Sequence, residues 1–460
     1  MNAAIEPAKR TLGRFAHDCG GRLEGADRTY LGVSTDTRTL KSGELFVALR
    51  GPRFDGHHFV AAAAAAGAAG TLVDARQPAA LAQILVEDTE RALGRAAAAW
   101  RGAFRLPLVG VAGSNGKTTA KEMIGAILSQ AGTCLVTRGN LNNQIGVPLT
   151  LLRVEPTHHF AVVEIGTNHA GEVAALARIA RPTIGLITNA GAEHLEGFGS
   201  LEAVARAEGE MVEGLEASAV AVLNADDPFL PLWRAATRAR VVTFGLREPA
   251  EFRARDVAAR IVEGAFRTTF RLECDQGSAA VELRLAGRHN VANALAAAAA
   301  SVAAGATLEH VRAGLAAMRA VHGRLELKRA RSGAWLIDDS YNANPSSVRA
   351  GIEVLEELGG HRWLVLGDMA ELGEFAHTSH AEIGTFAREH GVERLFATGS
   401  LAQLAVESFG AGGAWYPDGE ALARALEAQA GAEVRLLVKG SRVNRLERVV
   451  AALVGPHGGA

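Results

Sequence analysis

The chain has 460 residues, of which 48% are hydrophobic and 21% are charged, and its formal net charge is −2. This composition is typical of a globular protein with roughly two to four domains, and the small net charge argues against binding nucleic acid or anionic membranes through broad electrostatic attraction. The three scattered cysteines form no C-x-x-C pair, and we find neither a secretion signal nor an apolar membrane span, so we expect a protein of the reducing cytoplasm.

Short β-like runs and alanine-rich helices alternate up to about residue 102. We expect strands at residues 30–33, 44–47 and 70–73. The alanine-rich run 61–69 predicts a packed helix, because it is short and alanine is only weakly apolar. This region contains no phosphate loop, and we predict a first domain over residues 1–102.

The second region, residues 103–320, alternates strands and helices as a parallel sheet does. Residues 266–285 instead alternate apolar and polar side chains, which predicts a small antiparallel addition. The parallel strands are expected at 109–112, 160–163, 184–188, 219–223 and 241–244.

Four strand-then-helix units fill residues 321–460, which predicts a smaller, doubly wound third domain. Their strands are expected at 335–337, 363–366, 394–396 and 434–438. The predicted fold class is therefore α/β with three domains, a central phosphate-loop domain with a parallel sheet and a C-terminal Rossmann-like domain.

A glycine-rich turn, GSNGKTT, follows the first strand of the central region and precedes apolar residues at helical spacing. In such a turn the backbone N–H groups surround an anion, Lys117 faces the outer phosphates and the Thr118 hydroxyl meets Mg²⁺. Position 111 is Val, so the strict pattern G-x4-G-K-[ST] is not met, and a plain turn containing G-K-T stays an alternative. The nucleotide-binding candidates are Gly113, Ser114, Asn115, Gly116, Lys117, Thr118 and Thr119.

Other polar groups follow the next strands of the central region. Glu164 follows the strand FAVV, His194 lies in TNAGAEHLEGFGS, and Asp226 and Asp227 lie in NADDP. The carboxyl ends of parallel strands meet at one edge of the sheet, where ligands bind. Glu164 there offers the hard oxygen that magnesium bound to ATP requires. The two aspartates form a normal turn signature and are expected to be structural.

Three further polar clusters stand out. GRHNVANALAA places amides at the start of a helix, where they either face a base edge or cap the helix. IDDSYNANPSS is unusually polar for a strand–helix connection, and VKGSRVNRLE suits an anion site, with a solvated helix start as the alternative. The residues concerned are Asn290, Asn293, Asp339, Asn342, Asn344, Lys439 and Arg442.

The chain resembles the Mur ligase family, and within it the MurF type, over nearly its whole length. The resemblance includes STDTRTLKSGELFVALRGPRFDGHHF, EIGTNHAGEV, GRHNVANALAA, GRLE, DDSYNANPSS and KGSR. GSNGKTT matches the shorter loop G-x-x-G-K-[ST] of the whole superfamily. NLNNQIGVPLTLL, HLEGFGS and GDMAELGE are more specific to the MurF type.

The resemblance implies an ATP-dependent ligase with ATP and Mg²⁺ as cofactors. It implies that the terminal carboxylate of UDP-N-acetylmuramoyl-tripeptide is phosphorylated and that the amine of D-alanyl-D-alanine then displaces phosphate. A carboxylate is a poor acyl donor, because attack would have to expel oxide, whereas an acyl phosphate carries a good leaving group. The product would be the UDP-linked pentapeptide precursor of peptidoglycan, and the enzyme would be a monomer.

The resemblance also implies residue roles. Catalysis would involve Lys117, Glu164, His194 and Arg324. The metal ligands would be Thr118, Glu164 and His194, and ATP would further contact Asn293, Arg324 and Asp339. The substrates would contact Ser34, Asp36 and Arg38 in the first domain, and Asn142, Asn342, Asn344, Lys439 and Arg442 elsewhere.

One position departs from the family. Mur ligases usually have a carbamylated lysine, an anionic magnesium ligand, in the helix after the histidine motif. In SLEAVARAEGEM the aligned residue is Glu208. We hypothesise that Glu208 supplies this negative charge directly at the metal site, which predicts that activity does not depend on bicarbonate. The alternative is a surface glutamate without a role.

Three alternatives compete with this interpretation. A MurE-like or folylpolyglutamate-synthase-like ligase would share the ATP chemistry, but HLEGFGS and GDMAELGE argue against both. A phosphate-loop switch or motor leaves the clusters at 338–344 and 439–442 unexplained. A nucleotide-binding partner that has lost catalysis is disfavoured because Lys117, Thr118, Glu164 and His194 are all present.

Overall fold

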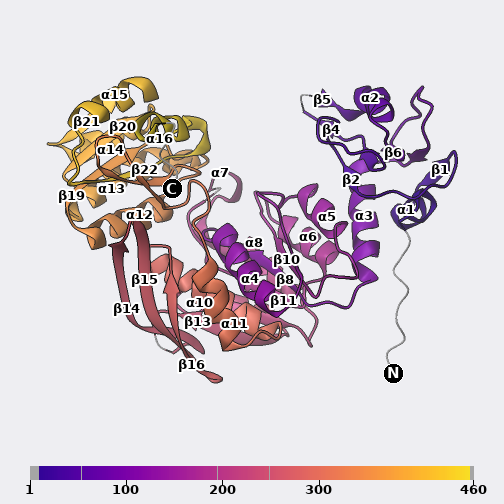
Figure 1. Ribbon diagram of the computed structural model, residues 1–460, viewed down its shortest axis with the longest axis horizontal. Coiled ribbons are helices and arrows are strands. Elements are labelled where there is room, and N and C mark those ends of the chain that lie inside the picture. Colours follow the sequence, from indigo (N-terminus) through magenta and orange to yellow (C-terminus); the bar gives the residue numbers. More distant parts are fainter. Residues whose placement is uncertain (1–9, 53, 194, 248, 456–460) are drawn as a thin grey trace.

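The computed structural model describes residues 10–52, 54–193, 195–247 and 249–455. Three sheets follow one another along the chain, and Figure 1 shows them in an arc with the first and third at its two ends. They lie within residues 22–85, 108–283 and 326–439, and the domain boundaries at 102 and 320 stay predictions. Within the described ranges, the structure contains no helix that is long and apolar enough to span a membrane.

The first sheet has five strands in the order β1-β7-β6-β3-β2. A strand was predicted at 30–33, but the observed strand β2 begins only at Val33. The predicted helix at 61–69 is shorter than expected, with six residues at Val60–Ala65, because Gly67 turns the chain with φ +85° towards the next strand. The elements are α1 (Leu12–Cys19), β1 (Arg22–Glu24), β2 (Val33–Ser34), β3 (Leu45–Val47), α2 (Val60–Ala65), β6 (Gly70–Val73), β7 (Gln83–Leu85) and α3 (Thr89–Gly102), with a separate hairpin of β4 (Arg50–Gly51) and β5 (Phe54–Asp55).

The central sheet has nine strands in the order β16-β15-β14-β13-β12-β11-β8-β10-β9. All five predicted parallel strands are present. The antiparallel addition starts earlier than expected and continues the same sheet. The strands are β8 (Leu108–Ala112), β9 (Cys134–Val136), β10 (Phe160–Glu164), β11 (Ile184–Ile187), β12 (Val220–Asn224), β13 (Arg240–Gly245), β14 (Phe252–Val262), β15 (Ala265–Cys274) and β16 (Gly277–Leu283).

Helices cover both faces of the central sheet. One face packs against α4 (Lys117–Ala131), α10 (Arg288–Ala303) and α11 (Leu308–Ala317). The other face packs against α6 (Glu172–Ala180), α8 (Leu201–Glu213) and α9 (Leu230–Ala236), and its apolar core continues into α3 of the first domain. The short helices α5 (Gly146–Leu151) and α7 (Leu195–Phe198) complete this region. The first and central domains therefore share a hydrophobic core.

The third sheet has six strands in the order β17-β18-β22-β19-β20-β21 and is parallel except at β17. The four predicted strands are present, and the three-domain α/β fold class is confirmed. The strands are β17 (Glu326–Arg329), β18 (Trp335–Asp339), β19 (His361–Leu366), β20 (Arg394–Thr398), β21 (Gly413–Tyr416) and β22 (Val434–Lys439), and the helices are α12 (Pro345–Leu358), α13 (Ala376–Glu389), α14 (Ala402–Phe409), α15 (Gly419–Gln429) and α16 (Glu447–Val454).

Candidate active site

A cavity of about 850 Å³ lies at the carboxyl ends of the central parallel strands. Its walls come from the phosphate loop (residues 113–119), the loop before α5, the start of α10 and the C-terminal domain, and Glu90 of α3 also lines it. The cavity brings together most of the predicted site residues from segments far apart in sequence: Ser114, Asn115, Gly116, Lys117, Thr118, Thr119, Asn142, Glu164, Asn293, Arg324, Asp339, Asn342, Asn344 and Lys439.

The phosphate loop turns tightly between β8 and α4, and two glycines make this turn possible. Gly113 has φ +116°, and a Cβ there would lie 2.1 Å from the Thr188 hydroxyl oxygen. Gly116 has φ +85°, and a Cβ there would lie 2.4 Å from Oδ1 of Asn293. A side chain at either position would be strained and would also clash with a neighbouring residue. The helix α4 then begins at Lys117, which directs its N-terminus into the cavity.

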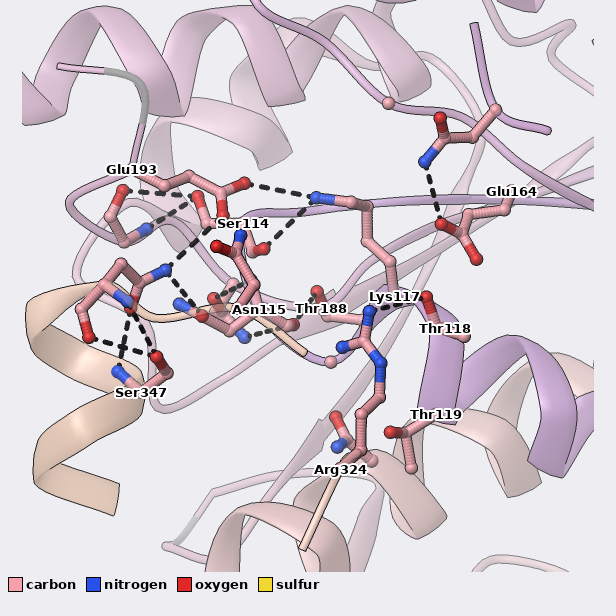
Figure 2. Close-up of a pocket in the computed structure, with 18 of the residues that line it drawn as sticks. Ser114, Asn115, Lys117, Thr118, Thr119, Glu164, Thr188, Glu193, Arg324 and Ser347 are labelled. Carbon is pink, nitrogen blue, oxygen red and sulfur yellow. Dashed lines mark hydrogen bonds and ion pairs between the residues drawn. The ribbon is translucent and has the colours of Figure 1, made fainter. Parts of the chain in front are cut away.

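Lys117 is held by the loop and by a carboxylate (Figure 2). Its Nζ donates to the carbonyl oxygens of Gly113 at 2.6 Å and Ser114 at 3.1 Å, and to Oε1 of Glu193 at 3.1 Å. Burial opposes the charged ammonium, but the carboxylates of Glu193 and Glu208 nearby raise its pKa above the usual value. The lysine is therefore a cation neutralised from within the chain. Sequence reasoning missed Glu193, although it directly precedes the histidine that we singled out.

The C-terminal domain contacts the phosphate loop directly. Asn344 donates from Nδ2 to Oδ1 of Asn115 at 2.8 Å and also lies 3.4 Å from Oε2 of Glu193. Asn115 in turn donates to the Ser346 hydroxyl at 3.0 Å. Asn344 also caps α12, because its Oδ1 accepts from the backbone of Ser347 at 2.8 Å. The N-terminus of α12 therefore faces the loop across the domain interface.

Arg324 approaches the start of α4 from the segment between the two domains. Figure 2 shows its side chain reaching the Thr118 hydroxyl, to which Nη2 donates at 3.2 Å. Its guanidinium lies 4.5 Å from the ring centroid of Tyr341. This stacking fixes a delocalised cation beside the loop.

Glu164 at the end of β10 is 2% exposed. Its Oε1 accepts from Nδ2 of Asn142 at 2.9 Å, whereas Oε2 accepts no hydrogen bond from any residue that the structure describes. A buried carboxylate oxygen that accepts no hydrogen bond requires another partner, such as a cation. Glu164 and Thr118 both line the cavity, and a carboxylate with a hydroxyl is a donor set that suits Mg²⁺. The residues present therefore fit this ion.

Glu208 in α8 lies behind the phosphate loop and does not line the cavity. It is 1% exposed, so the alternative of a surface glutamate is wrong. Its Oε2 accepts from the backbone N–H of Gly113 at 2.6 Å, and within the described residues Oε1 has no hydrogen-bond partner. Burial raises the pKa of Glu208 to about 7, although Lys117 opposes this shift.

The strand–helix junctions of the third domain meet at a buried ion pair. Lys439 is 3% exposed, and its Nζ donates to Oδ2 of Asp339 at 2.5 Å and to the carbonyl of Asn342 at 3.0 Å. The alternative of a solvated helix start is therefore wrong for this lysine. Arg442 is exposed and outside the cavity lining, with its guanidinium 5.3 Å from the Tyr341 ring centroid.

Two amides at the start of α10 bond to each other rather than capping the helix. Asn293 donates to Oδ1 of Asn290 at 3.2 Å, and Asn290 donates to the carbonyl of Ala286 at 2.7 Å. The N-cap is Gly287, so the capping alternative is wrong. Both amides line the cavity, where a base edge remains the other interpretation.

The remaining sequence candidates lie elsewhere. Ser34, Asp36 and Arg38 form a local turn in the first domain and do not line the cavity. The exposed Arg38 hydrogen-bonds Asp36 and lowers the pKa of that carboxyl to about 2. Asp227 accepts from the backbone of Ala190 at 2.8 Å, which agrees with the expected structural role. His194 lies outside the described residues.

The chain matches three family models in order. Residues 29–101 match one described as "Mur ligase family, catalytic domain", residues 111–301 match "Mur ligase middle domain", and residues 323–442 match "Mur ligase, glutamate ligase domain". Together the matches extend through most of the chain and include every residue that lines the cavity except Val321.

Named relatives are similar over nearly their full length. UDP-N-acetylmuramoyl-tripeptide–D-alanyl-D-alanine ligase of Escherichia coli is 43% identical, covering 96% of this chain and 98% of the relative. The crystal structure of MurF from Acinetobacter baumannii superposes with a TM-score of 0.89 at 33% identity, covering 96% of this chain and 98% of that one. MurF from Thermotoga maritima in complex with ADP gives a TM-score of 0.81 at 28% identity, covering 92% and 96%.

Proposed function

This chain belongs to the Mur ligase family, and on that premise we propose that it joins D-alanyl-D-alanine to UDP-N-acetylmuramoyl-tripeptide with consumption of ATP. The product is the UDP-linked pentapeptide precursor of peptidoglycan. The observation that carries this proposal is that one cavity is lined by Lys117 and Glu164 of the central domain and by the DDSYNANPSS segment of the C-terminal domain. MurE-like and folylpolyglutamate-synthase-like substrates are set aside, because the similar full-length relatives bear the name of the D-alanyl-D-alanine ligase.

The chain's own groups suit transfer of a phosphoryl group between two anions. Such a reaction needs positioning and neutralisation of charge rather than a protein nucleophile. Lys117 and the backbone N–H groups of the phosphate loop would hold the phosphates, and Arg324 would stabilise charge on the transferred group. Thr118 and Glu164 would hold Mg²⁺, which neutralises phosphate charge and lets the substrate carboxylate approach. His194 as a further ligand stays a prediction.

The C-terminal domain would complete the site. Asn344 and Asn342 would lie near the transferred group and the incoming dipeptide, because both line the cavity beside the phosphate loop. Asp339 would accept a hydrogen bond from the ribose through the carboxylate oxygen that does not accept from Lys439. Arg442 as a substrate contact stays a prediction.

The substrate's other end would extend towards the first domain. Glu90 of α3 lines the same cavity as the phosphate loop, which supports a path for the peptide from that domain to the reacting carboxylate. Ser34, Asp36 and Arg38 stay predictions for the uridine diphosphate end. We also expect a monomer in the cytoplasm, and size-exclusion chromatography with light scattering measures the former directly.

Glu193 would act as a stand-in for the nucleotide's phosphate in the free enzyme. When the nucleotide binds, its phosphate oxygens must displace the Glu193 carboxylate from the Lys117 ammonium. Because Glu193→Gln removes this competing charge, we expect the variant to bind ADP without Mg²⁺ about three- to tenfold more tightly. Isothermal titration calorimetry measures this change, with Glu202→Gln, an exposed glutamate of α8, as the matched control. Unchanged or weaker ADP binding in Glu193→Gln would show that the carboxylate does not compete with phosphate.

The function is tested by phosphate release from ATP with UDP-N-acetylmuramoyl-tripeptide, with and without D-alanyl-D-alanine, and by the mass of the product. We expect sustained release only with both substrates and a product heavier by the dipeptide less water. Equal release with neither substrate would instead identify a switch or motor and overturn the proposal.

A further inference from the structure

A second lysine of α4, Lys121, is completely buried with 0% exposure. It lies one helical turn after Lys117, and the sequence pattern gave no reason to single it out. Burying an ammonium group is costly unless it is paired with acceptors and opposite charge. Its contacts therefore indicate what the fold gains from it.

The Lys121 ammonium has three close oxygens and one more distant one. Nζ donates to the carbonyl oxygens of Thr137 at 3.0 Å and Gly139 at 3.2 Å and pairs with Oε1 of Glu122 at 2.9 Å. Oε2 of Glu164 lies 3.6 Å away. Two of its N–H groups donate to the carbonyl oxygens, and at 3.6 Å Oε2 of Glu164 is within ion-pair range of Nζ but beyond hydrogen-bond distance. Glu164 therefore receives the positive charge without a hydrogen bond, which leaves the lone pairs of Oε2 free.

The same ammonium also shapes the segment that holds the other oxygen of Glu164. Thr137 and Gly139, whose carbonyls accept from Lys121, lie five and three residues before Asn142 in the chain. The Asn142 amide donates to Oε1 of Glu164 at 2.9 Å. The Thr137 hydroxyl accepts from the backbone N–H of Glu164 at 3.1 Å. Lys121 thus connects α4, residues 137–142 and the end of β10. Figure 2 shows the resulting carboxylate, with one oxygen bonded to an amide and the other without a partner among the residues drawn.

We propose that Lys121 is a positioning residue that fixes residues 137–142 and the carboxylate of Glu164, so that Oε2 of Glu164 is held without a hydrogen bond. The chain thereby presents a preformed hard ligand for a divalent cation before the nucleotide arrives. Lys121 touches neither substrate nor metal and acts through Glu164 and residues 137–142. This inference rests on the proposed function only in assigning Glu164 to Mg²⁺.

The first test compares ADP binding with and without Mg²⁺ in Lys121→Met, Glu164→Gln and the double variant. Outer partners of metal ligands typically change metal affinity by about 10- to 100-fold. We expect Lys121→Met to reduce the Mg²⁺-dependent tightening by about tenfold or more while the metal-free dissociation constant changes less than about threefold. In the Glu164→Gln background, Lys121→Met should cause no further loss, because the ligand through which it acts is already gone.

The second test is a thermal-unfolding cycle of the same variants without nucleotide. Lys121→Met leaves the Glu164 carboxylate buried without its cation, which is strongly destabilising. Glu164→Gln removes that charge, so we expect the double variant to melt at a higher temperature than Lys121→Met alone. The matched control is Lys328→Met in the C-terminal domain, where Lys328 pairs with buried Asp338 at 2.6 Å outside the cavity. This control should lower the melting temperature without changing the Mg²⁺ dependence.

The outcomes separate this inference from the proposed function. Two results would overturn the positioning role. One is that Mg²⁺ tightens ADP binding to folded Lys121→Met as much as to the wild type. The other is that the melting-temperature shift of the double variant equals the sum of the shifts of the two single variants. If Lys121→Met alone does not fold, the double variant decides, because failure of both to fold would show that Lys121 serves the fold independently of Glu164. If Glu164→Gln itself keeps the full Mg²⁺ dependence, the metal site of the proposed function is wrong instead.

Discussion

Lys117→Met is expected to lower kcat for pentapeptide formation by about a thousandfold or more. Losing one preorganised donor to a developing oxyanion costs about 10²–10³ in kcat, and Lys117 is a full charge that would face the transferred phosphoryl group. The neighbouring Arg324 bonds to the Thr118 hydroxyl rather than to the loop carbonyls that hold Lys117, so it cannot take over this position.

The measurement is steady-state turnover with all three substrates, together with ADP affinity. Lys41→Met serves as the matched control, because Lys41 is an exposed lysine of the first domain. The pair Lys117→Met/Glu193→Gln removes the carboxylate that would otherwise lose its cation, so this double variant should regain stability but no activity. A kcat within about tenfold of the wild type would contradict the role given to Lys117.

Glu208→Gln is expected to raise stability and lower activity together. The pKa of Glu208 rises in the fold from an ordinary 4.5 to about 7, so folding disfavours the charged carboxylate. The resulting cost is absent below pH 4.5, grows up to pH 7 and is complete above it, where it reaches on the order of 3 kcal/mol. Glutamine carries no such charge, and its amide oxygen still accepts from the N–H of Gly113.

Urea unfolding of the nucleotide-free protein at pH 8 and pH 5 measures this effect. We expect Glu208→Gln to exceed the wild type clearly at pH 8 and much less at pH 5, with Glu213→Gln, an exposed residue at the end of the same helix, unchanged at both. Turnover should fall by about tenfold or more, because the negative charge behind Lys117 and the loop is lost. A variant that is less stable at pH 8 would mean that the carboxylate stabilises the free enzyme.

Most of the fold could be predicted because its signals are local. A buried parallel strand such as β8 is a short apolar run, and α4 shows its apolar residues at helical spacing directly after a glycine turn. Seven short strands were missed, namely β1, β4, β5, β7, β9, β17 and β21. β9 and β21 lie at sheet edges with three and four residues, and β17 has a charged sequence, ELKR. Edge strands bury less surface and therefore carry a weaker apolar pattern.

The sequence predicted those site residues that belong to a recognisable motif or follow a strand. It did not predict residues whose role depends on contacts with distant parts of the chain. Lys117 and Glu164 follow strands of one sheet, so the topology alone places them together. Glu193 and Lys121 become significant only through contacts with those two residues. A lone glutamate or a helical lysine is typically a surface residue, and the sequence contains no signal that either is turned inward.

The two lysines that line the cavity are already paired with the chain's own carboxylates. Lys117 pairs with Glu193, and Lys439 pairs with Asp339. A small inorganic anion would have to break such a pair and would gain little else in return. A nucleotide offers a base, a sugar and several phosphates that contact the cavity at once. These two lysines of the free enzyme should therefore resist occupation by the phosphate and chloride dissolved around it, and they should release the inorganic phosphate product correspondingly easily.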